Sequence, residues 1–262
     1  MCEIEDNKST NNMNDLTELI NIRDKFQASL RDWFDIAHAL IATTSIGAET
    51  VIGYMQSNPD ASYSFAVPVI INEDQSFASI NKLSYEEIFK RYFSHKGAIT
   101  ELVYGRIVQQ WYDFLNQIIE QVVKDHITGV KIYPKIPKVE VKLDFSTENI
   151  LEEVPRLIKE SFDFKKNYEK TKLLEDCLEQ KIDENLKKEI KKAIIVRNIL
   201  EHNQGFIRNK DLKDTGSNSI KLINSSCQEQ DWKSGEKIEI TIYELYRLKN
   251  LFYHISKQLI PD

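Results

Sequence analysis

The sequence of 262 residues predicts a mostly α-helical protein with a small β-hairpin insertion and one or two short edge strands. Apolar residues recur at spacings of three and four along most of the chain, which is typical of helices with one buried face. Strand-like patterns are confined to short stretches near 65–71, 130–145 and 217–242. A composition of 41% hydrophobic and 29% charged residues is that of a soluble globular chain.

The N-terminal third is predicted to hold a tail, a long helix and a strand. Residues 1–14 carry neither a basic nor an apolar signal segment, so they are expected to form a disordered tail. Helical spacing covers 16–41, and a further helix or turn extends to Tyr54. Two prolines then exclude a regular helix interior, and 65–71 is predicted as a short edge strand.

The most apolar stretch, residues 102–123, predicts a long core helix. Ser84 is placed to cap a preceding helix, with a break expected at 94–97. Aromatic side chains at helical spacing, such as Trp111, are expected in the core rather than as a base-stacking platform. Three polar residues at the start of the long helix are candidates to line a cleft: Glu101, Tyr104 and Arg106.

The C-terminal half is predicted to contain a connector, further helices and a hairpin. Lysines alternate with apolar residues over 130–145, which indicates an extended connector or edge strand. Helices are then expected in the following places: from Thr147 through Ile158, over 168–178, from near Asp183 to Gly205, and after Thr241. The segment between the last two of these helices is predicted to form a loop and then a hairpin, with strands within 214–223 and 235–245 and a polar tip between them.

A polar window near the end of the helix that begins near Asp183 is the main functional signal. At 100° per residue, Arg197, Asn198, Glu201 and His202 fall within a sector of about 140°, while the rest of the circumference is apolar. Arg197 and Glu201 are spaced i,i+4, as are Asn198 and His202, so each pair can touch across one turn. Gly205 is well placed to end the helix in a left-handed conformation.

The residue types in this window suit phosphate chemistry. His202 lies near the negative end of the helix dipole, which favours the imidazolium form and proton transfer near neutral pH. The planar fork of donors on Arg197 suits a phosphate or a phosphorane transition state. These two residues indicate a metal-free phosphodiester site. The alternative is an ordinary solvated helix face with a capping histidine.

The segment Arg197 to His202, RNILEH, matches the Arg-polar-x-x-x-His form of the RX4-6H motif. In this motif the chain resembles the HEPN superfamily, including its RiboL-PSP and MAE types. The resemblance implies a HEPN-like helical bundle that forms a homodimer and cleaves RNA without a metal, with motifs from two protomers facing each other. It also implies that His202 performs acid/base chemistry, Arg197 holds the scissile phosphate and Asn198 supports the geometry.

The resemblance also implies a domain organisation. Residues 15–262 would form a single domain, with a HEPN core over about 84–260 and an N-terminal helical extension over 15–83. Spacing alone does not identify the motif, because Arg31 with His38 and Arg247 with His254 are also separated by suitable intervals. Both of these histidines lie in aromatic-rich runs and are expected in a core or an interface.

The charge distribution favours a local contact with nucleic acid. The chain has a net charge of −6, yet Leu186 to Lys213 holds eight basic and three acidic residues. Such a basic island fits RNA phosphates, and its candidate RNA-binding residues are Lys191, Lys192, Arg208 and Lys210. The alternative is that these lysines form a solvated helix face.

Other chemistries lack support in the sequence. There is no phosphate-binding glycine loop, no HExxH and no paired CxxC, so neither a metal nor a cofactor is expected. Three cysteines without metal-like spacing indicate a reduced, cytoplasmic setting, and no membrane insertion is expected.

Three functions are compatible with these observations. The first is a metal-independent endoribonuclease of the toxin or anti-phage defence kind, acting on an RNA substrate as a homodimer. The second is a non-catalytic HEPN-like module that binds a partner such as an antitoxin, a nucleotidyltransferase or a nucleotide. The third is a structural domain of a larger defence assembly.

Overall fold

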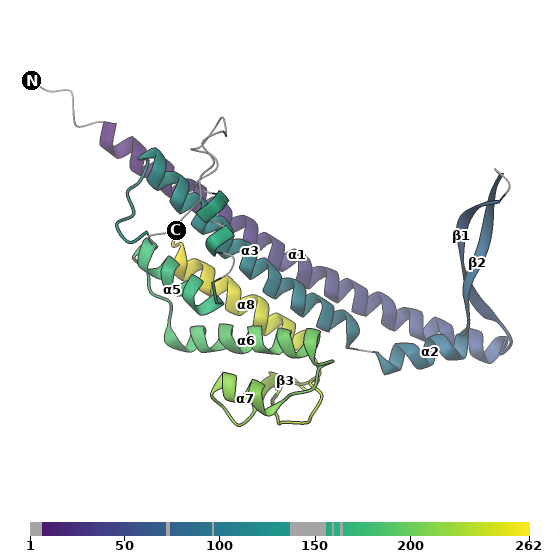
Figure 1. The fold of residues 1–262 in the computed structure, drawn as a ribbon. Helices are drawn as coiled ribbons and strands as arrows, with labels where there is room; N and C mark the ends of the chain where they lie inside the picture. The colour runs from purple at the N-terminus through teal and green to yellow at the C-terminus, as the bar shows by residue number, and fades with distance from the viewer. Residues whose placement is uncertain (1–6, 72–73, 96, 137–155, 159, 163–164) are drawn as a thin grey trace, which may run out of the picture. The chain divides into compact units, whose positions relative to one another are not determined.

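The computed structural model describes residues 7–71, 74–95, 97–136, 156–158, 160–162 and 165–262 (Figure 1). The chain divides into two compact units. The helical unit comprises Met1–Phe34 and Glu101–Asp262, and the insertion unit comprises Asp35–Thr100. The sequence predicts one domain whose core begins near residue 84. In the structure, the N-terminal helix up to Phe34 instead belongs to the same unit as the C-terminal helices. This is because Phe26 and Leu30 bury their side chains in the helical unit.

The prediction of a mostly α-helical fold is confirmed. The helical unit is built from the first part of α1 and the greater part of α3, with the elements that follow them. The bounds are α1 (Asn7–Ser57), α3 (Ala98–Thr128), α5 (Asn167–Leu178), α6 (Glu184–His202), α7 (Asn209–Thr215), β3 (Ile220–Ile223), β4 (Glu229–Trp232) and α8 (Ile242–Leu259).

Helix α3 forms the centre of the helical unit. Most of its apolar residues are at most 2% exposed, and they recur at helical spacing from Val103 to Val123. The ring of Phe114 stacks on Phe26 of α1 with centroids 4.3 Å apart, and Trp111 stacks on Phe252 of α8 at 5.1 Å. Offset stacking of this kind adds to the stabilisation from burial. The expected core role of these aromatic residues is therefore confirmed.

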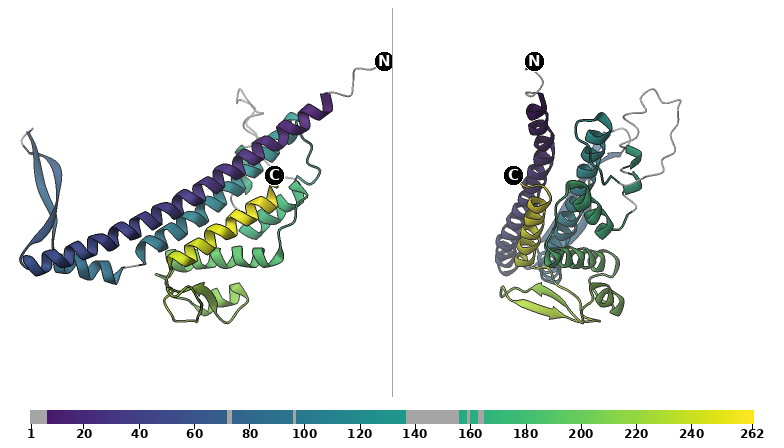
Figure 2. Two further views of the ribbon diagram at one scale, coloured as in Figure 1. Left: turned by 180° about the vertical axis from the view of Figure 1, so that it is seen from behind. Right: turned by 90° about the vertical axis from the view of Figure 1, so that its left-hand side faces the viewer.

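Helix α8 runs alongside the first part of α1 (Figure 2). Arg23 is buried, and its Nη1 donates to the carbonyl of Ile260 at 2.8 Å. Its Nη2 pairs with Asp262 at 2.7 Å, and Nε2 of Gln27 donates to Oγ of Ser256 at 2.9 Å. Buried polar groups that find partners avoid the cost of desolvation, so these contacts fix how the two helices align.

The C-terminal hairpin is joined to α8 by a buried carboxylate. Thr241 caps α8 by accepting from the amide of Glu244 at 3.1 Å, as predicted. The Glu244 side chain does not complete a capping box with Thr241; it accepts from the amide of Ile223 in β3 at 2.8 Å and pairs with Arg247. Burial raises the pKa of Glu244, although Arg247 and the Ile223 amide oppose this.

The insertion unit contains the second part of α1, an antiparallel hairpin and α2 (Tyr85–Ser94). Its strands are β1 (Ser62–Ile71) and β2 (Asp74–Ser84). Ser84 and Glu87 form the predicted capping box at the start of α2. Only the first of the two strands is predicted from the sequence. The second is rich in polar residues, which a two-stranded ribbon tolerates because both faces are open to solvent.

Two further helical segments differ from the predictions. Helix α1 begins at Asn7, whereas a tail is predicted over 1–14; no proline or glycine separates 7–14 from the helix that follows, so the helix propagates. Residues 1–6 lie outside the described residues. Helix α7 replaces a predicted loop, because Asp211 accepts from the Arg208 amide and so caps it.

The hairpin near the C-terminus forms with a different second strand. The sequence pairs a strand near 220 with one near 237–242, but β3 pairs with β4. The later segment instead runs beside the chain that leaves α6, since the Ile238 amide donates to Gly205 at 2.9 Å and Phe206 forms a bridge with Lys237. The predicted connector beyond residue 136 and the start of the helix predicted from Thr147 lie outside the described residues.

Helix α1 contains a long apolar segment. Within the described residues, Thr17–Ser57 is long and apolar enough to cross a membrane by length and composition alone, and its apolar stretch is largely exposed. Several hydroxyl groups in its second half bond to carbonyls of the same helix, as when Thr44 Oγ1 donates to the Leu40 carbonyl at 2.8 Å. The expectation that the chain does not enter a membrane stays a prediction.

Replacing Phe252 should test the central role of α3 packing. Phe252 is fully buried against Trp111, so Phe252→Ala should lower the free energy of unfolding by about 3–5 kcal/mol. Urea denaturation measures the decrease. Tyr243→Ala on the same helix is the control, because Tyr243 is 44% exposed and should cost far less. Equal decreases for the two variants would contradict this packing.

Candidate functional site

Helix α6 begins and ends where the sequence places it. Asp183 caps its start by accepting from the amides of Asn185 and Leu186 at 2.8 and 3.3 Å. At the other end the chain turns sharply, with φ of 53° at Gln204 and 85° at Gly205. A Cβ at Gly205 would lie 3.3 Å from the Lys237 side chain, so both the positive φ and the close strand favour glycine.

Arg197 is held by its neighbours on α6. Its Nη2 lies 2.6 Å from Oε2 of Glu201, and its Nη1 donates to Oδ1 of Asn198 at 3.2 Å. The arginine side chain is 24% exposed. Its Nε is buried and has no acceptor among the described residues. Because Nε is inaccessible in this conformation, a ligand oxygen would bind the Nη hydrogens that Glu201 and Asn198 leave free.

The Arg197–Glu201 pair lies against α3. A Cβ at Gly105 would be 3.5 Å from Oε1 of Glu201, so the carboxylate approaches the α3 backbone closely. Burial raises the pKa of the Tyr112 phenol, and the charge of Glu201 adds to the rise while that of Arg197 opposes it. Gly105 and Tyr112 are the α3 residues at this site that sequence reasoning missed, because no spacing within one helix reveals a contact between two helices.

The α3 residues proposed from sequence have other surroundings. Tyr104 is 1% exposed in the core, where burial raises its pKa well above the usual range. Arg106 lies with its guanidinium carbon 5.2 Å from the centre of the Trp33 ring. Glu101 is half-buried. Tyr104 and Arg106 thus serve packing on α3.

Asn198 and His202 are exposed, and no contact joins them among the described residues. The predicted contact across one turn therefore forms for Arg197 with Glu201 only. Arg197 and His202 are five residues apart, which separates them by about 140° around the helix. Within one protomer the guanidinium faces α3 while the imidazole faces solvent.

A buried aspartate stabilises the turn that follows His202. Asp211 is 6% exposed and accepts from the Arg208 amide at 2.9 Å, from Arg208 Nε at 3.2 Å and from Asn203 Nδ2 at 3.4 Å. Burial alone would raise the pKa of this carboxyl, but the hydrogen bonds from Arg208 lower it below its ordinary value. Asp211 was missed as a site residue, because the sequence indicates a loop here.

The four candidate RNA-binding residues occupy different environments. Lys191 is exposed, and Lys210 is exposed on α7. Lys192 forms an ion pair with Glu189 and its side chain is 16% exposed, which makes it a poor phosphate ligand. The guanidinium of Arg208 pairs with Asp211 at 3.0 Å but remains 57% exposed.

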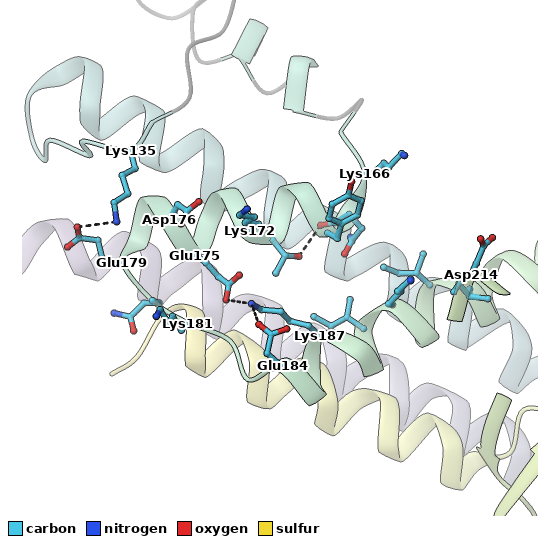
Figure 3. Close-up of a pocket in the computed structure, with 18 of the residues that line it drawn as sticks. Lys135, Lys166, Lys172, Glu175, Asp176, Glu179, Lys181, Glu184, Lys187 and Asp214 are labelled. Atoms are coloured by element: carbon cyan, nitrogen blue, oxygen red, sulfur yellow. Dashed lines mark hydrogen bonds and ion pairs between the residues drawn. The ribbon is translucent and has the colours of Figure 1, made fainter. Parts of the chain in front are cut away.

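A groove with a volume of about 1210 Å³ lies between α5 and α6 (Figure 3). We call it the lysine groove, because seven lysines line it: Lys135, Lys166, Lys172, Lys181, Lys187, Lys191 and Lys213. Its apolar part is formed by Ile190, Ile194 and Ile195. Lys187 bridges Glu175 and Glu184, each at 2.8 Å. Of these seven lysines, only Lys191 is predicted from the sequence to bind RNA.

The two rival arginine–histidine pairs differ from the polar window. Arg247 donates to Glu229, to Glu244 and to the Lys221 carbonyl, so it connects the hairpin to α8. His254 and His38 are exposed, so neither is a core residue. Their use in an interface stays a prediction.

The two cysteines that the structure describes differ in exposure: Cys177 is buried and Cys227 is exposed. Burial raises the pKa of the Cys177 thiol to about 11, which disfavours the nucleophilic thiolate. No group of three histidine, cysteine or acidic side chains is placed to hold a metal ion there.

Comparison with known proteins finds no matching family model and no significantly similar curated protein or solved structure.

Asp211→Asn should destabilise the fold in a pH-dependent manner. Because the pKa of Asp211 is lowered by folding, its charge stabilises the protein above the unfolded value of 3.8, and this contribution disappears as the pH falls through the folded pKa. At pH 7 we expect a loss of about 1–2 kcal/mol from weakened charged hydrogen bonds. The gap between wild type and variant in unfolding free energy should begin to close as the pH falls below 3.8 and should be absent once the pH is below the folded pKa. A gap that is constant with pH would contradict the role given to this carboxylate.

Proposed function

We propose that the protein is a metal-independent endoribonuclease that uses Arg197 and His202 at the end of α6. The observation that supports it most is the setting of these residues: the Arg197 side chain is 24% exposed, and Asn198 and His202 are exposed on the α6 face that borders the lysine groove. The motif RNILEH, which resembles the HEPN superfamily, provides the second line of support.

In the proposed reaction the 2′-hydroxyl of a ribose attacks the adjacent phosphorus. The imidazole of His202 accepts the hydroxyl proton as the O2′–P bond forms and the P–O5′ bond breaks. A second histidine, in its imidazolium form, donates a proton to the departing O5′. Arg197 donates hydrogen bonds to the non-bridging oxygens, where negative charge increases in the transition state. The products are a 2′,3′-cyclic phosphate and a 5′-hydroxyl.

The geometry of α6 favours a site shared by two protomers. Arg197 and His202 diverge by about 140° around one helix, so one protomer does not bring both onto the same phosphate without a change in conformation. Two antiparallel α6 ends would provide both histidines and both arginines to one substrate. We therefore include a homodimer in the proposal, together with a cytoplasmic toxin or anti-phage role.

The second candidate function is a non-catalytic binding module. The pairing of Arg197 with Glu201 at 2.6 Å favours it, because a neutralised arginine is a weaker phosphate ligand. In that case the same window would bind an antitoxin, a nucleotidyltransferase or a nucleotide, or would serve a larger assembly.

Loss of either proposed catalytic side chain should abolish cleavage. We expect His202→Ala to reduce the rate by about 10²–10⁴-fold and Arg197→Ala by about 10²–10³-fold, as is typical for acid/base groups and charge-stabilising donors. The measurement is cleavage of labelled RNA in EDTA. Arg31→Ala and His254→Ala are matched controls, since both side chains are exposed and outside the window. Full activity in both window variants would remove the assignment.

Glu201→Gln should increase the affinity for RNA. The carboxylate competes with phosphate for the Arg197 guanidinium, and a partly exposed ion pair of about 0.2–1 kcal/mol corresponds to a gain of up to about fivefold. Fluorescence anisotropy with a 2′-O-methyl RNA measures the Kd without cleavage. Glu239→Gln removes an equal charge at an exposed position near Gly205 and serves as the control. An unchanged or weaker affinity for Glu201→Gln would mean that the pair does not compete with phosphate.

A further inference from the structure

The lysine groove and the proposed catalytic residues share one face of α6. Counted at 100° per residue, Lys187, Lys191, Asn198 and His202 lie within about 60° of one another around the helix. Lys187 and Lys191 line the groove, whereas Asn198 and His202 follow along the same helix. Lys191 and His202 are separated by a rise of about 16 Å. A chain-like ligand in the groove would therefore be directed toward His202.

The groove has an excess of positive charge after internal pairing. Lys187 pairs with both Glu175 and Glu184, which leaves one negative charge in excess there, and Lys135 is near Glu179 at 3.9 Å (Figure 3). The groove lysines without an ion pair among the described residues are Lys166, Lys172, Lys181, Lys191 and Lys213. The acidic lining residues in the same situation are Asp176 and Asp214. Seven lysines against five acidic residues give the whole lining a net charge of +2, which favours a polyanion although the chain as a whole is acidic.

The groove also provides surface for bases. Ile194 and Ile195, which are half-buried, form an apolar strip on α6, and Tyr168, which is 65% exposed, contributes an aromatic ring from α5. Its hydroxyl donates to Glu169 at 3.0 Å, which fixes one end of the ring. Single-strand binding sites combine cations that follow the backbone with aromatic or apolar surfaces for unpaired bases. A duplex hides its bases and would not use this strip.

We propose that the lysine groove binds single-stranded RNA that flanks the cleaved phosphate, with lysines on the backbone and bases on the apolar strip. This inference rests on the proposed function, because it identifies the substrate of that site as an unpaired strand several nucleotides long. The groove contributes to substrate affinity, and Arg197 and His202 contribute to the chemical step.

The test compares two triple variants of the full-length protein. In Lys172→Gln/Lys191→Gln/Lys213→Gln the groove loses three cations. In Lys25→Gln/Lys188→Gln/Lys233→Gln the same charge is removed from exposed positions that do not line the groove, one of them on α6. Both variants should retain the wild-type unfolding transition. The probes are uncleavable 2′-O-methyl single strands of about 4 and about 12 nucleotides, which bracket common site sizes.

We expect the groove variant to bind the longer strand at least tenfold more weakly than the control variant. The slope of log K against log salt should fall by about 0.7 for each RNA phosphate that a lysine no longer neutralises. The shorter strand should discriminate less between the variants. Equal affinities of the two variants for the longer strand, or tighter binding of a duplex or of a polyglutamate peptide than of single-stranded RNA, would overturn the inference.

Failure of this inference can be separated from failure of the proposed function. If the groove variant equals the control while His202→Ala no longer cleaves RNA, the groove assignment is wrong and the nuclease proposal stands. If the groove variant loses binding but wild type never cleaves RNA, the groove is an RNA-binding site and the catalytic proposal is wrong.

Discussion

The packing of α3 against α1 and α8 is the interaction on which the helical unit depends. Trp111 and Phe114 lie between Phe26 and Phe252, so one helix carries two aromatic contacts to segments more than 200 residues apart in sequence. Burial of large aromatic side chains is among the most stabilising contributions available to a core. The same helix presents Gly105 and Tyr112 to α6, so α3 connects the core to the candidate site.

The candidate site depends on two features of α6. The first is its length, which places the polar window beyond the end of the groove. The second is its end near Gly205, where the chain turns toward α7 and Asp211 accepts hydrogen bonds from Asn203 and Arg208. In the isolated protomer the ion pair with Glu201 occupies part of the Arg197 guanidinium and so limits its binding to phosphate, whereas His202 remains exposed. A helix that separates these two side chains suits a reaction in which two protomers act on one substrate.

Much of the helical architecture could be predicted from sequence, because periodicity and capping are local properties. Ser84, Asp183 and Thr241 each cap a helix where the sequence places one. The pairing of strands was harder, since partners such as Gly205 and Ile238 are distant in sequence and β2 shows no clear alternation. The site was predicted in part: the window on α6 is visible along one helix, but its α3 neighbours and the α5 side of the groove depend on packing between helices.

The most direct test of the central claim is the chemistry of the cleaved RNA. A substrate with a single 2′-deoxy nucleotide on the 5′ side of the cleaved phosphate lacks the attacking hydroxyl. If Arg197 and His202 catalyse the proposed transesterification, this substitution should block cleavage at that position in EDTA, and the unmodified RNA should yield a 2′,3′-cyclic phosphate. Cleavage of the modified strand at the same rate, or products with a 5′-phosphate, would contradict the account.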